Sequence, residues 1–130
     1  TNVMHLHGEI LKMRSERRLD LIYEITDDIL IGDKAEDGAQ LRPYIVWFAE
    51  AVPMIEEAVP VVQQADLFVV VGTSLVVYPA AGLLTVADDS IPKFIIDKKI
   101  PYTSSVRNLT AIEKPATEGV KALIELLKEK

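Results

Sequence analysis

A run of five apolar residues, Leu67 to Val71, constrains the fold of this chain more than any other feature. Most of these side chains are β-branched or aromatic, which favours a β-strand over a helix. A strand without alternating polar positions is typical of burial on both faces, as in the central strand of a parallel sheet. Gly72 follows the run directly and ends it. The sequence therefore predicts an α/β fold built on an open, largely parallel sheet.

The flanking segments predict further elements of the same fold. Buried strands are expected at residues 44–48, 93–96 and 109–112, a short strand or turn around residue 6, and a short strand at 29–31. Helices are expected at residues 54–64, 79–87 and 120–127. Pro60 lies inside the first of these helices and should kink it. Strands that alternate with helices in this way indicate a sheet that is covered by helices.

An acidic segment interrupts this pattern between residues 20 and 40. It contains one basic residue, Lys34, and seven acidic ones, which are Asp20, Glu24, Asp27, Asp28, Asp33, Glu36 and Asp37. We interpret residues 14–40 as a small subdomain outside the main sheet. The basic cluster at its start, formed by Arg14, Arg17 and Arg18, is expected to be a solvent-exposed face.

Composition excludes several classes of function. The chain has no cysteine and two histidines, which excludes disulfides, thiol catalysis and a histidine-rich metal site but leaves carboxylate-bound magnesium open. The net charge of −6 argues against nucleic acid as a partner. No apolar run approaches the ~20 residues that span a bilayer. We expect a cytoplasmic protein without a membrane partner, and the sequence leaves its oligomeric state open. Because the chain starts without Met inside an apolar element, we also expect a piece of a longer protein.

Polar groups follow two of the predicted strands, where open parallel sheets bind their ligands. Gly72, Thr73 and Ser74 could hold ribose or phosphate oxygens through hydroxyl and N–H groups, and a plain strand-to-loop turn is the alternative. Asp97 ends the strand at 93–96 and could accept hydrogen bonds from ribose hydroxyls, with a solvent-facing turn as the alternative. The chain contains neither G-x-G-x-x-G nor a P-loop.

His7, which precedes Gly8, is a candidate general base, because an imidazole exchanges protons near neutral pH. A structural role is the alternative. His5 would point to the opposite face of a strand and is expected to be structural or exposed. Trp47 and Phe48 could wall a channel for a long aliphatic side chain, with core packing as the alternative.

Taken in order, three segments resemble motifs of the sirtuin family. Residues 5–9 resemble the family's L-H-G segment, and residues 41–53 are similar to R-P-x-[IV]-V-x-F-G-E-x-x-P. Residues 65–82 are similar to A-D-x-x-[IVL]-x-[IV]-G-T-S-L-x-V-x-P-A. The matches run in family order from residue 3 to the C-terminus. The chain is therefore identified as a member of the family, of the bacterial type that lacks the zinc cysteines.

The resemblance implies an NAD-dependent protein lysine deacylase. In that reaction the acyl oxygen of a modified lysine attacks C1′ of the nicotinamide ribose, nicotinamide leaves, and the acyl group passes to ADP-ribose. The resemblance makes His7 the general base. It implies that NAD is bound by Gly72, Thr73, Ser74, Asp97 and Ala116. It implies that an acylated-lysine protein or peptide is held as an added strand by Val46, Phe48, Ala49 and Val77. Residues 1–130 would then be the C-terminal part of a Rossmann-like NAD-binding domain, truncated at its N-terminus, with a small irregular insert.

Four departures from the family pattern qualify this expectation. The G-A-G-x-S and N-x-D segments are not in the chain, and the four zinc cysteines are absent, so no metal is expected. Ala49 replaces the glycine of F-G-E, which predicts either crowding of the peptide or a strained backbone, and Asp97 stands where many members have Asn. We therefore expect the chain alone to bind NAD poorly and to be inactive. The alternatives are a catalytically dead remnant that binds protein or a partner chain, and a generic nucleotide-binding domain.

Overall fold

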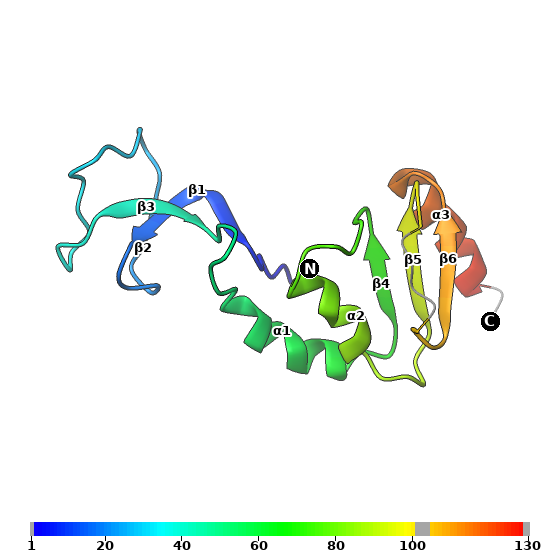
Figure 1. Cartoon of the computed structure of the whole chain (residues 1–130). Coiled ribbons are helices and arrows are strands. Elements are labelled where there is room, and N and C mark those ends of the chain that lie inside the picture. Colours follow the sequence, from blue (N-terminus) through cyan, green and yellow to red (C-terminus); the bar gives the residue numbers. More distant parts are fainter. Residues whose placement is uncertain (1, 101–104, 129–130) are drawn as a thin grey trace. The chain divides into compact units, whose positions relative to one another are not determined.

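The computed structural model describes residues 2–100 and 105–128. These divide into two compact units, Thr1–Met54 (unit 1) and Ile55–Lys130 (unit 2), and Figure 1 shows the elements of each.

Unit 1 is an antiparallel sheet of three strands in the order β2-β1-β3. The strands are β1 (Gly8–Ser15), β2 (Ile22–Glu24) and β3 (Leu41–Ile45). Residue 6 lies in a turn, and the strand begins only at Gly8, so the turn of the two alternatives is the one observed. The short strand predicted at residues 29–31 is wrong, because these residues adopt no regular structure.

Polar side chains make up much of the interior of unit 1. Ser15 is fully buried; its hydroxyl donates to Asp37 Oδ2 at 2.7 Å and accepts the N–H groups of Arg17 and Arg18 at 3.1 Å each. Arg14 is also buried and donates to the carbonyl oxygen of Ser15 at 2.7 Å. The prediction of a solvent-exposed basic cluster is therefore wrong for Arg14, whose guanidinium satisfies backbone oxygens, and right for Arg17 and Arg18.

Unit 2 contains a parallel sheet in the order β4-β5-β6. Its strands are β4 (Phe68–Val71), β5 (Lys93–Asp97) and β6 (Leu109–Glu113), which confirms the parallel sheet predicted from the apolar runs. The central strand among the described residues is β5, not β4. Val71 at the end of β4 is 42% exposed, whereas Ile95 and Ile96 of β5 are completely buried.

Helices pack on both faces of this sheet, with α2 (Leu83–Val86) on one face and α3 (Ala116–Lys128) on the other. The other helices labelled or drawn in Figure 1 are α1 (Met54–Gln63) and η1 (Ala80–Gly82), which directly precedes α2. Because neighbouring side chains of a strand point to opposite faces, Ile96 packs against Leu123 of α3 while Ile95 packs against Leu84 of α2. The result is the layered α/β architecture that the sequence predicts. The single helix expected at residues 79–87 is instead split into η1 and α2.

Gly119 sets how closely α3 approaches β5. A Cβ atom at this position would lie 2.2 Å from Cγ2 of Ile96, which is far inside van der Waals contact. The glycine therefore allows the helix backbone to rest directly on the buried strand.

Candidate functional site

The carboxyl edge of the parallel sheet gathers the residues predicted to bind NAD. Val71 lies beside Ile96, and Asp97 lies beside Glu113, so the three strands end at one level. Gly72 directly follows β4, Asp97 is the last residue of β5, and Ala116 begins α3 just after β6. The structure thus brings these residues to one edge, as the sequence predicts. That they bind NAD stays a prediction.

The loop after β4 is an exposed turn with two residues in the left-handed region. Gly72 has a φ of +67°, and its N–H donates to the carbonyl of Ile96 at 2.9 Å. The Thr73 hydroxyl accepts the N–H of Leu75 at 3.2 Å, and Leu75 also has a positive φ of 53°. Gly72, Thr73 and Ser74 are all exposed, so their polar groups can reach a ligand. Val77 lies further along the same loop and is 48% exposed.

Unit 1 places His7 next to the segment predicted to bind substrate. The N–H of Val46 donates to the carbonyl of His7 at 3.0 Å, and Gly8 pairs with Ile45. Gly8 has a φ of +87°, and a Cβ there would lie 2.1 Å from the carbonyl oxygen of Tyr44. This position therefore requires glycine, and glycine seats His7 against β3. The side chain of His7 is exposed, and so is that of His5, as predicted.

The segment after β3 is an exposed turn. The strand predicted at residues 44–48 is shifted, because β3 covers Leu41–Ile45 and ends before the aromatics. Trp47 and Phe48 are 54% and 90% exposed, so they do not pack into a core. Glu50 donates its N–H to the carbonyl of Trp47 at 3.1 Å, which closes the turn. Ala49 has a φ of +69°, so the strained backbone that the replaced glycine suggested is present.

An ion pair that the sequence analysis missed closes over this turn. Arg42 Nη1 and Nη2 donate to Glu50 Oε1 and Oε2 at 2.6 and 3.0 Å. The same Oε2 accepts the N–H of Trp47 at 3.0 Å. Arg42, and next the Trp47 N–H, hold the pKa of the Glu50 carboxyl below its usual range. The only sequence signal was that Arg42 and Glu50 are the charged positions of the 41–53 motif.

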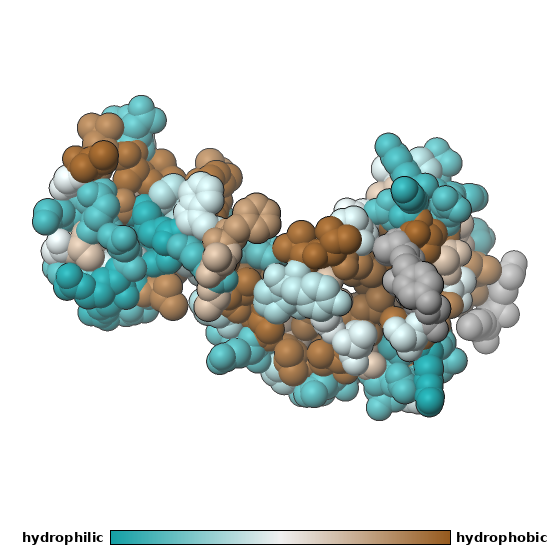
Figure 2. Space-filling view, in the orientation of Figure 1, coloured by the Kyte–Doolittle hydropathy of each residue, from teal (hydrophilic) through white to brown (hydrophobic). Residues whose placement is uncertain are grey.

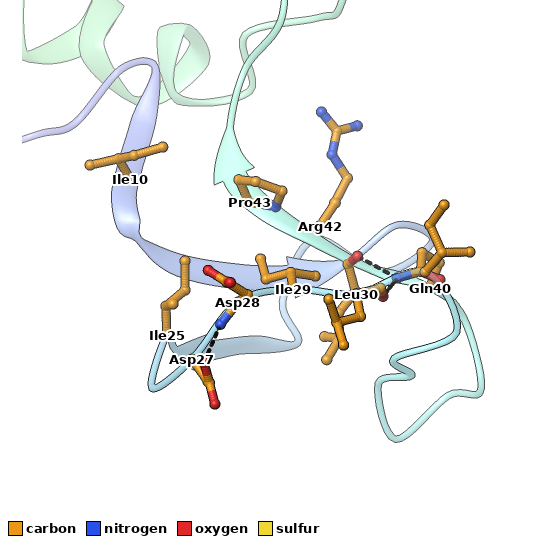
Figure 3. A pocket seen from close by; sticks show the side chains of 11 residues that line it. Ile10, Ile25, Asp27, Asp28, Ile29, Leu30, Gln40, Arg42 and Pro43 are labelled. Carbon is orange, nitrogen blue, oxygen red and sulfur yellow. Dashed lines mark hydrogen bonds between the residues drawn. The ribbon is translucent and has the colours of Figure 1, made fainter.

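Unit 1 also contains a groove of about 520 Å³ between residues 25–31 and strand β3, which Figure 3 shows. The side-chain amide of Gln40 fixes its wall, donating to the carbonyl of Leu30 at 2.9 Å and accepting the N–H of Gly32 at 2.7 Å. None of the residues predicted to bind NAD or substrate lines it. The groove is therefore separate from the predicted contacts.

In residues 2–100 and 105–128, no group of three or more histidine and carboxylate side chains is placed to hold a metal ion. Within the same ranges, no helix combines the length and apolar character that crossing a membrane requires.

Hydrophobic residues reach the surface of both units, as Figure 2 shows. Trp47 and Phe48 belong to them in unit 1, and Val76, Val77 and Tyr78 in unit 2.

Comparison with known proteins decides the family. The profile of the Sir2 family matches residues 1–79, which contain the His7 segment, the turn after β3 and the loop after β4. The chain belongs to the Sir2 family. Two bacterial relatives carry the name NAD-dependent protein deacylase. The one from Bacteroides thetaiotaomicron is 47% identical over 98% of this chain, and the one from Helicobacter pylori is 43% identical over 99%. This chain spans 57% and 56% of the length of those two Sir2 relatives.

Solved structures of Sir2 proteins share the fold. A Sir2 homologue in complex with NAD matches 99% of this chain with a TM-score of 0.78 and 27% identity, and the match covers 52% of that protein. Sir2Tm bound to a propionylated peptide matches 100% of this chain with a TM-score of 0.74 and 25% identity, covering 58% of that protein. These matches confirm the Rossmann-like α/β fold.

Proposed function

We propose that this chain is part of an NAD-dependent protein lysine deacylase, which transfers the acyl group of a lysine to ADP-ribose and releases nicotinamide. The observation that carries the proposal is the 47% identity over 98% of the chain to a relative with that name. The structure of each unit supports it, since the predicted contacts other than the half-buried Val46 lie on exposed turns or at the edge of the parallel sheet.

The carboxyl edge of unit 2 suits a dinucleotide chemically. Gly72, Thr73 and Ser74 offer N–H and hydroxyl donors to phosphate or ribose oxygens, and Asp97 offers a carboxylate to ribose hydroxyls. One oxygen of Asp97 accepts the N–H of Lys99 at 3.1 Å, which orients the carboxylate. Ala116 at the start of α3 adds a backbone contact. When bound, NAD supplies the ribose carbon that takes up the acyl oxygen.

The exposed turn of unit 1 suits an extended peptide. Val46, Phe48 and Ala49, with Val77 of unit 2, would contact an acylated-lysine substrate, and Phe48 offers it an almost fully exposed aromatic face. His7 would accept a proton from a ribose hydroxyl during acyl transfer. Its exposed imidazole and its backbone bond to Val46 support that role.

We further propose that the 130-residue chain by itself binds NAD weakly and does not turn over, since it contains neither G-A-G-x-S nor N-x-D. A cysteine-free, NAD-using protein fits the reducing cytoplasm, which we propose as its location.

The test uses the longest reading frame that contains this chain, incubated with NAD and an acetyl-lysine peptide. We expect nicotinamide release, and we expect His7→Ala to lower the rate by a factor of about 10² to 10⁴. His5→Ala is the matched control, because His5 is also exposed and lies two residues away, and it should retain the rate. Unchanged turnover in His7→Ala would remove His7 from the mechanism. A protein that binds the acylated peptide but never releases nicotinamide would be a non-catalytic binding module.

A further inference from the structure

We propose that Arg42 and Glu50 are positioning residues for the acylated peptide, and that their ion pair holds the Trp47–Glu50 turn in the shape that receives it. This inference rests on the proposed deacylase function. It concerns residues that contact neither NAD nor the lysine in the scheme above, and that act through Phe48 and Ala49.

The turn needs an external support. It exposes two aromatic side chains to water, and it holds Ala49 in the left-handed region at a φ of +69°. Both features disfavour this conformation, because alanine rarely adopts positive φ and aromatic surface avoids water. Only one hydrogen bond within the turn backbone, from the Glu50 N–H to the Trp47 carbonyl at 3.1 Å, opposes them.

Glu50 supplies the missing support from its side chain. Its carboxylate accepts the Trp47 N–H at 3.0 Å, so the first and last residues of the turn are joined by two reciprocal bonds. Arg42 then fixes that carboxylate with two parallel hydrogen bonds. A bidentate arginine–carboxylate pair is directional, and this pair is partly shielded, with 19% and 36% of the two side chains exposed.

Arg42 is itself anchored in the sheet. It lies opposite Arg14 in the β1–β3 register, and the backbone of the same strand leads to Val46, which is bonded to His7. The turn is thus tied to the candidate base at one end and to β3 through Arg42 at the other. Loosening the ion pair would let Phe48 and Ala49 move relative to His7. Peptide binding should suffer before the chemical step does.

The first test uses Trp47, the only tryptophan of the chain, as a reporter inside the turn. In the 130-residue chain, Arg42→Ala and Glu50→Gln should shift Trp47 emission to the red and increase quenching by iodide. Arg42→Lys should restore part of the wild-type signal. Arg18→Ala is the matched control, because it breaks another bidentate arginine–carboxylate pair of unit 1, with Asp20, outside the turn. Circular dichroism checks that each variant keeps its fold.

The second test measures steady-state kinetics in the reading frame used above. We expect Arg42→Ala and Glu50→Gln to raise KM for the acetyl-lysine peptide about tenfold, with KM for NAD and kcat within about twofold of wild type. Arg18→Ala should change none of these. A fall in kcat together with an equal rise in the KM values for peptide and for NAD would show a general structural role and overturn the proposal.

The outcomes separate this inference from the proposed function. If the wild-type protein shows no deacylase activity, the proposed function fails, and with it the peptide-positioning role, whereas the emission data still report the ion pair. If the protein is an active deacylase and both variants keep wild-type peptide KM and Trp47 emission, only the positioning role is overturned.

Discussion

The two units differ in the kind of side chain that makes up most of their interior, although β5 of unit 2 also buries the charged Lys93 at 1% exposed. In unit 2, strand β5 contributes Phe94, Ile95 and Ile96, each at most 4% exposed, and helices cover both of its faces. In the described part of unit 1, the buried side chains are polar or small, namely Arg14, Ser15, Ala35 and Ala39, and only Ser15 is fully buried. Apolar packing depends on volume, whereas a polar interior depends on the direction of each hydrogen bond. The comparison teaches that the proposed NAD edge and the proposed substrate turn are supported by different forces.

A substitution in the apolar core of unit 2 tests this difference directly. Ile96→Ala removes a completely buried side chain between α3 and the sheet, and it should lower the free energy of unfolding of unit 2 by about 2–5 kcal/mol. The matched control is Ile31→Ala in unit 1, where the isoleucine is fully exposed, with an expected change within about 0.5 kcal/mol. Urea unfolding followed by circular dichroism measures both. Equal losses would contradict the assigned core.

The fit of α3 on β5 offers a second, smaller perturbation of unit 2. Gly119→Ala would drive a methyl group to within 2.2 Å of Ile96 Cγ2, and it should cost about 1–3 kcal/mol although alanine is the better helix former. Gly82→Ala is the control, because its added methyl would meet nothing closer than 3.7 Å. The midpoint temperature of thermal unfolding should therefore fall for Gly119→Ala and stay within about 2 °C of wild type for Gly82→Ala.

The polar interior of unit 1 should respond to the loss of one hydroxyl. Ser15→Ala leaves Asp37 and the N–H groups of Arg17 and Arg18 without their buried partner, at an expected cost of about 1–3 kcal/mol. Ser90→Ala in unit 2 is the control, since its hydroxyl bonds to Asp88 at an exposed site, and it should cost less than about 0.5 kcal/mol. Amide hydrogen exchange of β1 reports the difference, and equal protection in both variants would contradict a polar core.

Acid should affect the turn of unit 1 before the core of unit 2, where a carboxyl with a lowered pKa, Asp88, is bonded to Ser90 at an exposed site. The Ser15 hydroxyl lowers the pKa of Asp37, and Arg42 lowers the pKa of Glu50. A carboxyl whose pKa is lowered in the folded state adds to the free energy of unfolding at pH values above its usual pKa of about 4. This contribution is lost as the pH falls through the lowered pKa. We expect Trp47 emission to change in this acidic range before the exchange protection of β5 is lost. Simultaneous loss of both signals would show that unit 1 does not depend on these carboxylates.

The same contrast explains what the sequence could predict. In unit 2 the largely apolar segments at 67–71, 93–96 and 109–112 mark a parallel sheet whose central strand is buried, and the sheet itself carries Gly72 and Asp97 to one edge. In unit 1 the pattern of β-branched and aromatic residues predicted a buried strand that extends too far. Trp47 and Phe48 have the composition of a strand but lie in an exposed turn, because β-propensity does not decide exposure.

Directional contacts are the part that sequence could not supply. The buried Arg14 and the Arg42–Glu50 pair depend on hydrogen bonds to particular atoms, and no periodicity of the chain encodes them. That His7 and the predicted NAD contact Gly72 serve one reaction stays a prediction, because the two residues belong to different units.

The smallest expected effect concerns the Trp47–Glu50 turn of unit 1, and it tests whether the backbone of this exposed turn is strained. Ala49→Gly keeps a φ of +69° without the penalty that a Cβ imposes there, and it gives the unfolded chain more freedom. The first effect is about 1–2 kcal/mol and the second about 0.5–1 kcal/mol, so a net gain of about 0–1.5 kcal/mol is expected. Urea unfolding monitored by Trp47 should detect it. Ala51→Gly is the control, because Ala51 is exposed beside the turn without a positive φ, and it should lose stability. If Ala49→Gly also loses stability, the turn is not strained in solution, and Arg42 and Glu50 have less to hold in place.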